Sequence, residues 1–370
     1  MNNCDRIIGA WHRPNSSERE TNFEELCTVL DEFKAAGINT IFLETYFHGM
    51  AVLKTDLIDY RTKLRGYSYG DYPDYLTAFV EEADKRGIGV HAWVQDFYVG
   101  YKEETPIVQN HPEWMLITQS GSRRHTTEGQ GFGGYLFLDP ANPEVRDFLV
   151  KLYDEILTKV PKIKGLNLDY IRYPISEIDE GTDTGYTECC MSDFAAKEGL
   201  KLHSRYRRKS LIRKIAEGDL ADKWIAHRAG YVTEFVRQVH EMVTEKHPGK
   251  LISTAVFSEV EMTYMLKKQN VRVWIDNGYI NMVTPMVYFY ESAQVYDAVK
   301  KLTDMCSSVK CYSGLYTTYH KQTVEELDSH IKVSLEAGAK GFVLFDSAKT
   351  FFENTHDYMG YLSSTYGKQG

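Results

Sequence analysis

The chain lacks the features that mark several large classes of protein. It has six cysteines in 370 residues, and none forms a Cys-x-x-Cys pair, so neither a disulfide framework nor a zinc ribbon is expected. No run approaches the roughly 18 apolar residues of a membrane span, and "MNNCD" is too short for a secretory signal before the first predicted strand. We expect no membrane span and a cytoplasmic location, or an extracellular or cell-envelope one if a signal peptide was removed.

An excess of positive charge is also missing. The formal net charge is -9 and the sequence pI is about 5.8, whereas a nucleic-acid partner requires a basic surface that displaces counterions. Hydrophobic residues make up 43% and charged residues 26% of the chain, as in ordinary globular proteins. We therefore expect a folded globular protein without a nucleic-acid partner.

Several catalytic and cofactor motifs are absent. There is no His-Glu-x-x-His and no Gly-x-Ser-x-Gly, which removes the usual signatures of zinc proteolysis and serine hydrolysis. The pattern "GQGFGG" at 129–134 follows a polar loop and precedes an extended run, so it lacks the strand-before, helix-after context of a dinucleotide site. We expect neither a cofactor nor a metal.

Strand-like and helix-like segments alternate along the whole chain. Amphipathic helical patterns, several ended by glycine, separate the strand-like runs. Eight such strands are predicted, at 6–11, 39–47, 88–97, 165–174, 251–258, 279–288, 310–318 and 341–347. This order predicts an α/β fold, a (β/α)₈ TIM barrel formed as one domain over residues 1–370, with long insertions at 98–142 and 175–221 after strands three and four. An open doubly wound sheet is disfavoured because the turn "RPNSSERETN" after the first strand has no glycine.

The stretch "GLNLDYIRYP" at 165–174 ends a predicted buried strand with polar residues. Alternate strand residues point to opposite sides, so Asn167 and Asp169 are expected inside the barrel. Asp169 then lies at the carboxyl-end mouth, the functional face of such barrels. Arg172 is expected to favour the ionised form of Asp169, and Pro174 is expected to end the strand.

Acids and aromatic rings are predicted to gather at the same mouth. Glycoside hydrolysis needs one protonated and one ionised carboxyl group, about 5 to 10 Å apart. We predict Asp169 and Glu259, from adjacent strands four and five, as the catalytic pair; Asp346, Glu44 and Asp96 remain alternatives to Glu259. The predicted substrate-binding residues are Trp11, Glu44, His91, Trp93, Asp96, Tyr170, Arg172, Tyr288 and Asp346.

Four segments in order resemble the glycosyl hydrolase-like family related to family 10. They are "HAW" at 91–93, "HPEWMLITQSG" with "LFLDPANPEVRDFL" at 111–149, "GLNLDYIRYP" at 165–174, and "WIDNGYINMVTPMVY" at 274–288. The resemblance implies a (β/α)₈ barrel that hydrolyses glycosidic bonds, with Asp169 in the active site. It also implies an oligo- or polysaccharide substrate, with bacterial cell-wall peptidoglycan as one candidate.

One segment departs from the family pattern. The family commonly continues "HAW" with Phe and an Asn-Pro-Tyr-Arg run, whereas this chain reads "VQDFY", with Gln95 and Asp96 in place of Asn-Pro. Two other functions therefore stay open. One is a catalytically silent sugar-binding barrel, and the other is an enzyme on the same barrel that transfers sugars to an acceptor.

Overall fold

Eight parallel strands close into a barrel in the computed structural model, which describes residues 6–178, 181–218, 220–306, 308–317, 322–353 and 356–367. The strand order around the barrel is β1-β13-β12-β10-β9-β8-β4-β2, and β2 pairs again with β1. The strands are β1 (Ile7–His12), β2 (Thr40–Phe47), β4 (Gly89–Gln95), β8 (Gly165–Asp169), β9 (Leu251–Phe257), β10 (Met282–Met286), β12 (Ser313–Tyr316) and β13 (Gly341–Phe345). The predicted TIM barrel is confirmed.

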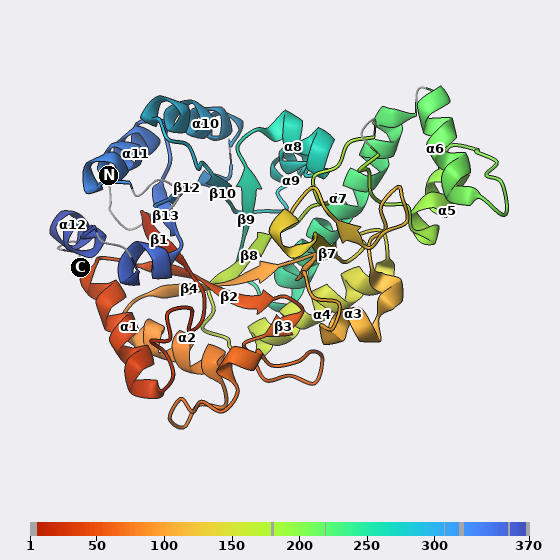
Figure 1. The fold of residues 1–370 in the computed structure, drawn as a ribbon. Coiled ribbons are helices and arrows are strands. Elements are labelled where there is room, and N and C mark those ends of the chain that lie inside the picture. The colour runs from red at the N-terminus through yellow and green to blue at the C-terminus, as the bar shows by residue number, and fades with distance from the viewer. Residues whose placement is uncertain are drawn as a thin grey trace.

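Helices connect successive strands and surround the barrel (Figure 1). They are α1 (Phe23–Ala35), α2 (Tyr75–Lys85), α4 (Pro143–Lys159), α7 (Ala221–Lys246), α8 (Val260–Lys267), α9 (Val271–Asp276), α10 (Ser292–Met305), α11 (Val324–Glu336) and α12 (Tyr358–Tyr366). Local chemistry fixes several starts; the Asn22 side chain, for example, accepts the Glu25 N–H at 3.0 Å. None of the helices in the described ranges is long and apolar enough to cross a membrane.

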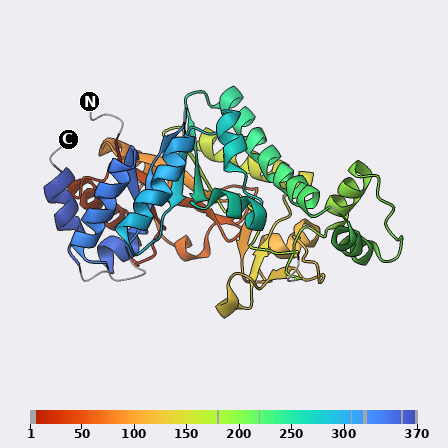
Figure 2. The same ribbon diagram turned by 90° about the horizontal axis from the view of Figure 1, so that it is seen from above.

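Two segments depart from the simple strand–helix alternation. Between β4 and α4, the strands β5 (Tyr98–Gly100), β6 (Arg124–His125) and β7 (Tyr135–Phe137) form a small antiparallel sheet. The short helix α3 (Pro106–Asn110) lies between β5 and β6 in the sequence. Between β8 and α7 lie α5 (Glu188–Lys197) and α6 (Arg207–Glu217), which project away from the barrel in both views (Figures 1 and 2). That the whole chain is one domain stays a prediction.

The loop between β8 and α5 is held against α7 by a buried ion pair. Arg228 Nη1 lies 2.6 Å from Asp183 Oδ1, and both side chains are fully buried. The Trp224 indole donates to the other carboxylate oxygen at 2.9 Å. Such a pair orients the segment, because leaving either buried charge without its partner is costly.

Two short strands, β3 and β11, add to the barrel sheet in the described part of the chain. β3 (Met50–Ala51) pairs antiparallel with the end of β2. The predicted strand at 310–318 forms β11 (Lys310–Cys311) and β12, and its last position lies outside the described residues.

The strand that carries Asp169 ends earlier than predicted. β8 stops at Asp169, five residues before Pro174, because Tyr170 adopts a left-handed backbone with φ of 51°. A non-glycine residue rarely adopts this conformation, which is concentrated at turns and functional sites. Pro174 therefore does not end the strand, and the turn at Tyr170 leaves the Asp169 carboxylate at the strand end.

Candidate active site

Asp169 lies at the carboxyl end of β8, with both carboxylate oxygens held in place. The Trp93 indole Nε1–H donates to Oδ2 at 3.0 Å, and the Tyr170 backbone N–H donates to Oδ1 at 2.7 Å. Trp93 comes from the neighbouring strand β4 and is itself buried. Asp169 stays partly exposed, so it combines a fixed orientation with access from the mouth.

Burial has a larger effect on the pKa of Asp169 than its neighbours have. Burial raises the pKa of Asp169 above the usual carboxyl value, while the hydrogen bonds from Trp93 and Tyr170 and the charges of Arg172 and Arg13 act in the opposite direction. Arg172 thus favours the ionised form of Asp169, as expected, but burial has the larger effect on this pKa. A carboxyl group with a raised pKa can hold or release a proton closer to neutrality than an ordinary aspartate.

Arg172 has a different main partner. Its guanidinium forms two bonds with Glu128, of 2.8 and 3.0 Å, in the planar geometry that suits an arginine–carboxylate pair. It also lies 4.6 Å from the ring centre of Tyr170. Burial opposes ionisation of Glu128, but the charge and hydrogen bonds of Arg172, the charge of Lys267 and the Ile175 N–H together outweigh it and lower the pKa of Glu128 to about 2. Arg172 thus supports the wall of the site.

Lys267 adds a buried amine to this wall. It is 8% exposed, ends α8, and its ammonium lies 3.1 Å from the ring centre of Phe257. Burial lowers the pKa of Lys267 to about 6; Arg172 acts in the same direction, and Glu128 and Asp169 oppose it. Lys267 is therefore largely neutral above pH 6 despite its polar surroundings.

A second group of charges lies around Arg13, which follows β1. Its Nε is 3.4 Å from Glu44 Oε1, and Arg61 Nη1 is 2.7 Å from the other Glu44 oxygen. Glu44 is fully buried between these two arginines. Arg13 also interacts electrostatically with Asp346 and Asp169. It is therefore close to three carboxylates: Glu44 of β2, Asp169 of β8, and Asp346, which follows β13.

Aromatic rings form the rest of the mouth. Tyr170 stacks on Tyr98 with ring centres 4.5 Å apart. Tyr288 packs against Tyr316 and Phe345 at 5.1 and 5.9 Å. Burial raises the pKa of Tyr288, and the charges of Asp169 and Asp346 both add to this effect. Tyr288 therefore lies near both carboxylates, among flat surfaces that suit sugar rings.

Asp346 follows β13, the strand opposite β8 in the barrel order. It is 7% exposed, and its Oδ1 accepts the Lys349 N–H at 3.0 Å. Its electrostatic partners Arg13 and Tyr288 are shared with Asp169. The structure thus brings Asp169 and Asp346 to the same set of neighbours.

Two of the acids considered from sequence have other surroundings. Glu259 directly precedes α8, with a side chain 49% exposed, and its described ion-pair partner is Lys301 of α10 at 3.7 Å. Asp96 is fully buried and accepts the Tyr153 hydroxyl of α4 at 2.7 Å. Burial raises the pKa of Asp96 well above the usual carboxyl value. Asp96 thus faces the helix layer, although Asp169 is close enough to affect its charge.

Two predicted substrate contacts lie deeper in the barrel. Trp11 is 2% exposed and donates to Asn167 Oδ1 at 3.0 Å, in the layer below Asp169. His91 pairs in register with Gly165, whereas Gln95 pairs with Asp169. Four strand residues span about 13 Å, so His91 lies inside the barrel, as parity predicts, but at its amino-terminal end.

The sequence matches a described family over most of its length. The model of the family called Glycosyl hydrolase-like 10 covers residues 7–331. The chain belongs to this family. The earlier resemblance is therefore confirmed, and the family's name indicates a glycoside-hydrolase-like function.

Curated relatives of this Glycosyl hydrolase-like 10 chain include two bacterial glycosyl hydrolases. DigH of Escherichia coli K12 is 23% identical over 293 residues, which cover 77% of this chain and 63% of DigH. YngK of Bacillus subtilis is 26% identical over 155 residues, 41% of this chain and 28% of YngK. The chain thus matches less than two thirds of the length of either relative.

Solved structures support the fold of this family member. A β-galactosidase from Rahnella sp. R3 superposes with a TM-score of 0.67 at 10% identity, covering 98% of this chain and 55% of that one. At this identity the likeness shows the barrel fold alone.

Sequence reasoning missed three ionisable residues of this Glycosyl hydrolase-like 10 site. Arg13 lies two positions beyond Trp11, so extending the strand parity by one step would have placed it inside the mouth. Glu128 comes from the loop between β6 and β7, and Lys267 from the end of α8. No pattern in the sequence connects these two to Asp169, because both arrive through tertiary packing.

Proposed function

We propose that the protein hydrolyses glycosidic bonds of an oligo- or polysaccharide, with Asp169 as a reacting carboxyl group. The supporting observation is the fixed, partly exposed Asp169 carboxylate, held by Trp93 and Tyr170 at the carboxyl end of β8. Catalytic residues of TIM-barrel enzymes come from this end of the strands. Bacterial cell-wall glycan is the first candidate substrate.

For the second carboxyl group we favour Asp346 over Glu259. Asp346 shares Arg13 and Tyr288 with Asp169, whereas the described ion-pair partner of Glu259 is Lys301. Glycoside hydrolysis needs two carboxyl groups that face the same bond. A pair across the mouth meets this requirement better than a half-exposed residue before α8.

The raised pKa of Asp169 makes its role measurable. If Asp169 donates the proton to the leaving oxygen, its loss of that proton produces the alkaline limb of the pH–rate profile. If it reacts as the ionised group, its protonation produces the acid limb instead. In both cases the limb lies above the usual aspartate pKa, because burial raises this pKa.

The decisive assay measures reducing ends and product masses on a panel of glycans. The panel contains bacterial wall glycans with and without peptide stems, and plant and storage polysaccharides. Asp169→Asn and Asp346→Asn are each expected to lower the rate roughly 10²–10⁴-fold. Asp147→Asn, a change of the same kind at an exposed position of α4, is the matched control and should keep full activity.

Other outcomes separate the competing functions. Glycan binding without turnover, unchanged by Asp169→Asn, indicates the silent sugar-binding barrel. Products longer than the substrate indicate transfer to an acceptor sugar, because hydrolysis adds water and shortens chains. Loss of activity in Glu259→Gln but not in Asp346→Asn would restore the pair predicted from sequence.

A further inference from the structure

A row of aromatic rings leads outward from the mouth of the barrel. Phe47, at the carboxyl end of β2, has its ring centre 5.9 Å from the guanidinium carbon of Arg13. It also stacks on His48, with ring centres 3.6 Å apart. His48 meets Tyr101 edge to face at 5.6 Å, and Tyr101 stacks on Phe132 at 4.4 Å. We call Phe47, His48, Tyr101 and Phe132 the aromatic row.

The aromatic row is carried by elements that follow the carboxyl ends of barrel strands. His48 lies in the turn between β2 and β3, Tyr101 directly follows β5, and Phe132 ends a short 3₁₀ turn between β6 and β7. Substrates of TIM-barrel enzymes bind at this end of the strands. Phe132 is 56% exposed and the other three residues are partly exposed, so the row borders solvent beside the mouth.

The aromatic row is fixed to the barrel at His48. Its Nε2 lies 3.0 Å from the Tyr98 hydroxyl, and Tyr98 stacks on Tyr170, the residue after Asp169, at 4.5 Å. Gly100 passes so close to His48 that a Cβ at this position would lie 3.1 Å from the ring carbon Cγ. Its φ of 99° also favours glycine. These contacts fix the position of the row relative to Asp169.

Charged groups border the outer rings of the row. The Arg124 guanidinium donates to the Tyr101 carbonyl at 3.0 Å and lies 3.3 Å from the Glu103 carboxylate. Both side chains are partly exposed. A sugar ring has an apolar face that packs on aromatic rings and a rim of hydroxyls that needs polar partners. This combination therefore suits a glycan chain that continues from the mouth.

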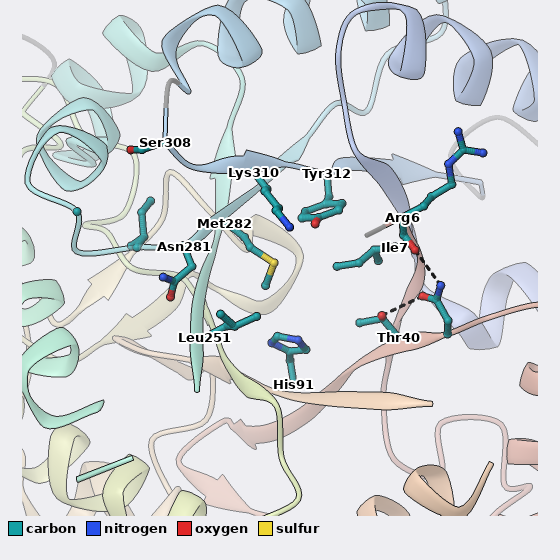
Figure 3. Close-up of a pocket in the computed structure, with 13 residues that line it drawn as sticks. Arg6, Ile7, Thr40, His91, Leu251, Asn281, Met282, Ser308, Lys310 and Tyr312 are labelled. Carbon is teal, nitrogen blue, oxygen red and sulfur yellow. Dashed lines mark hydrogen bonds between the residues drawn. The ribbon is translucent and has the colours of Figure 1, made fainter. Parts of the chain in front are cut away.

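A separate cavity of about 690 Å³ lies at the other, amino-terminal end of the barrel (Figure 3). His91 of β4 lines it, together with Leu251 and Met282, the first residues of β9 and β10. Asp169 ends β8, so the barrel interior lies between this cavity and the reacting carboxyl group. A glycan in the cavity would not be continuous with the mouth, whereas a glycan on the aromatic row would be.

We propose that the aromatic row binds sugar units of a long glycan at a distance from the bond that is cleaved. Phe132 and Tyr101 stack on the apolar faces of these sugars, and Arg124 and Glu103 bind their hydroxyls. The protein therefore favours long chains over disaccharides. This inference rests on the proposed hydrolysis at Asp169 and names its substrate as a polymer.

Calorimetry on the Asp169→Asn variant measures binding without cleavage. The probes are chitobiose and chitohexaose, and cellobiose and cellohexaose. At least one hexasaccharide should bind at least tenfold more tightly than its disaccharide. Phe132→Ala and Tyr101→Ala, each added to Asp169→Asn, should weaken binding of that hexasaccharide about threefold to tenfold, the contribution of one ring contact. Binding of the disaccharide should not change, and replacing both rings should remove most of the preference for length.

Tyr206→Ala is the matched control, because Tyr206 is a 50% exposed ring between α5 and α6. Added to Asp169→Asn, it should leave the affinity for both lengths unchanged. Thermal unfolding of each variant checks that the fold is kept. The proposal is overturned if no hexasaccharide is preferred over its disaccharide. It is also overturned if the Phe132 and Tyr101 variants bind the hexasaccharide as tightly as Asp169→Asn does, since the glycan then binds elsewhere, for example in the amino-terminal cavity.

A parallel assay separates this proposal from the hydrolysis on which it rests. It measures the release of reducing ends from bacterial wall glycan strands without peptide stems and from the two hexasaccharides. Length-dependent binding that needs Phe132 and Tyr101, without release from any glycan, would support the row and remove the hydrolysis. Equally fast release by wild type and by the protein with both rings replaced would support the hydrolysis and overturn the row.

Discussion

At the carboxyl end of the barrel, charged groups are paired and crowded, whereas at the amino end a neutral histidine faces an open cavity. Arg172 and Glu128 form a bidentate pair beside Asp169, while His91 Nδ1 lacks a partner in the described part of the chain. His91 lies on β4, Arg172 follows the adjacent strand β8, and Glu128 comes from the loop between β6 and β7. Inward orientation alone therefore does not define a catalytic residue; depth along the strand decides its environment.

The two ends also respond to pH with opposite sign. Burial raises the pKa of Asp169, so its contribution to stability falls as pH rises from its unfolded-state pKa through the raised value. Burial lowers the pKa of His91, so its contribution falls as pH drops from its unfolded-state pKa, near 6.5, to about 4. Burial penalises the charged form in both cases.

The largest expected effect comes from breaking the ion pair at the mouth. Glu128→Gln leaves Arg172 buried without its carboxylate and should lower the free energy of unfolding by about 3–5 kcal/mol. Urea unfolding at pH 7 measures this change. Glu103→Gln is the matched control, since Glu103 is 46% exposed and lies 3.3 Å from Arg124 in the same segment. A loss below about 1 kcal/mol for both variants would mean that the mouth is no more tightly paired than the surface.

The next effect tests the amino end. Wild type should lose about 2–3 kcal/mol of stability relative to His91→Phe between pH 7 and pH 4.5, because protonation of the buried ring is disfavoured only in the folded state. Urea unfolding of both proteins at the two pH values gives this difference directly. Parallel pH dependence of the two proteins would contradict the buried neutral histidine.

A smaller effect separates two tryptophans inside the barrel. Trp93→Phe removes the hydrogen bond to Asp169 and should lower activity roughly 10–100-fold, since bonds to a charged group contribute about 1.5–3 kcal/mol. Trp11→Phe removes a bond of the same length, but to Asn167 in the layer below, and should lower stability more than activity. Steady-state rates and unfolding midpoints of the two variants distinguish these roles. Equal losses of activity would show that depth in the barrel does not matter.

The smallest effect concerns Glu259. Its 3.7 Å contact with Lys301 is half-exposed, so Glu259→Gln should change stability by no more than about 1 kcal/mol. Thermal unfolding at low and at high salt measures this change and its screening. A larger loss would place Glu259 in a more enclosed setting than the structure shows.

Much of the barrel could be predicted because its signals are local. Strand-like runs, amphipathic helices and capping residues such as Asn22 follow from neighbouring residues in the sequence. Strand parity also placed Asp169, Trp93 and His91 inside the barrel. It failed to predict the early end of β8, because the left-handed backbone at Tyr170 has no signature in a run that reads as a strand up to Pro174.

The sequence by itself determined the eightfold alternation, the family and the inward face of each strand, since these depend on periodicity and on ordered motifs. Only the tertiary structure decided which inward residues share the mouth. Strand register places His91 about 13 Å below Asp169. Loop and helix packing bring Glu128 to Arg172, and bring Lys267 close to Glu128 and Asp169. Charge states followed from that packing, because burial depends on every element around a group and not on its own strand.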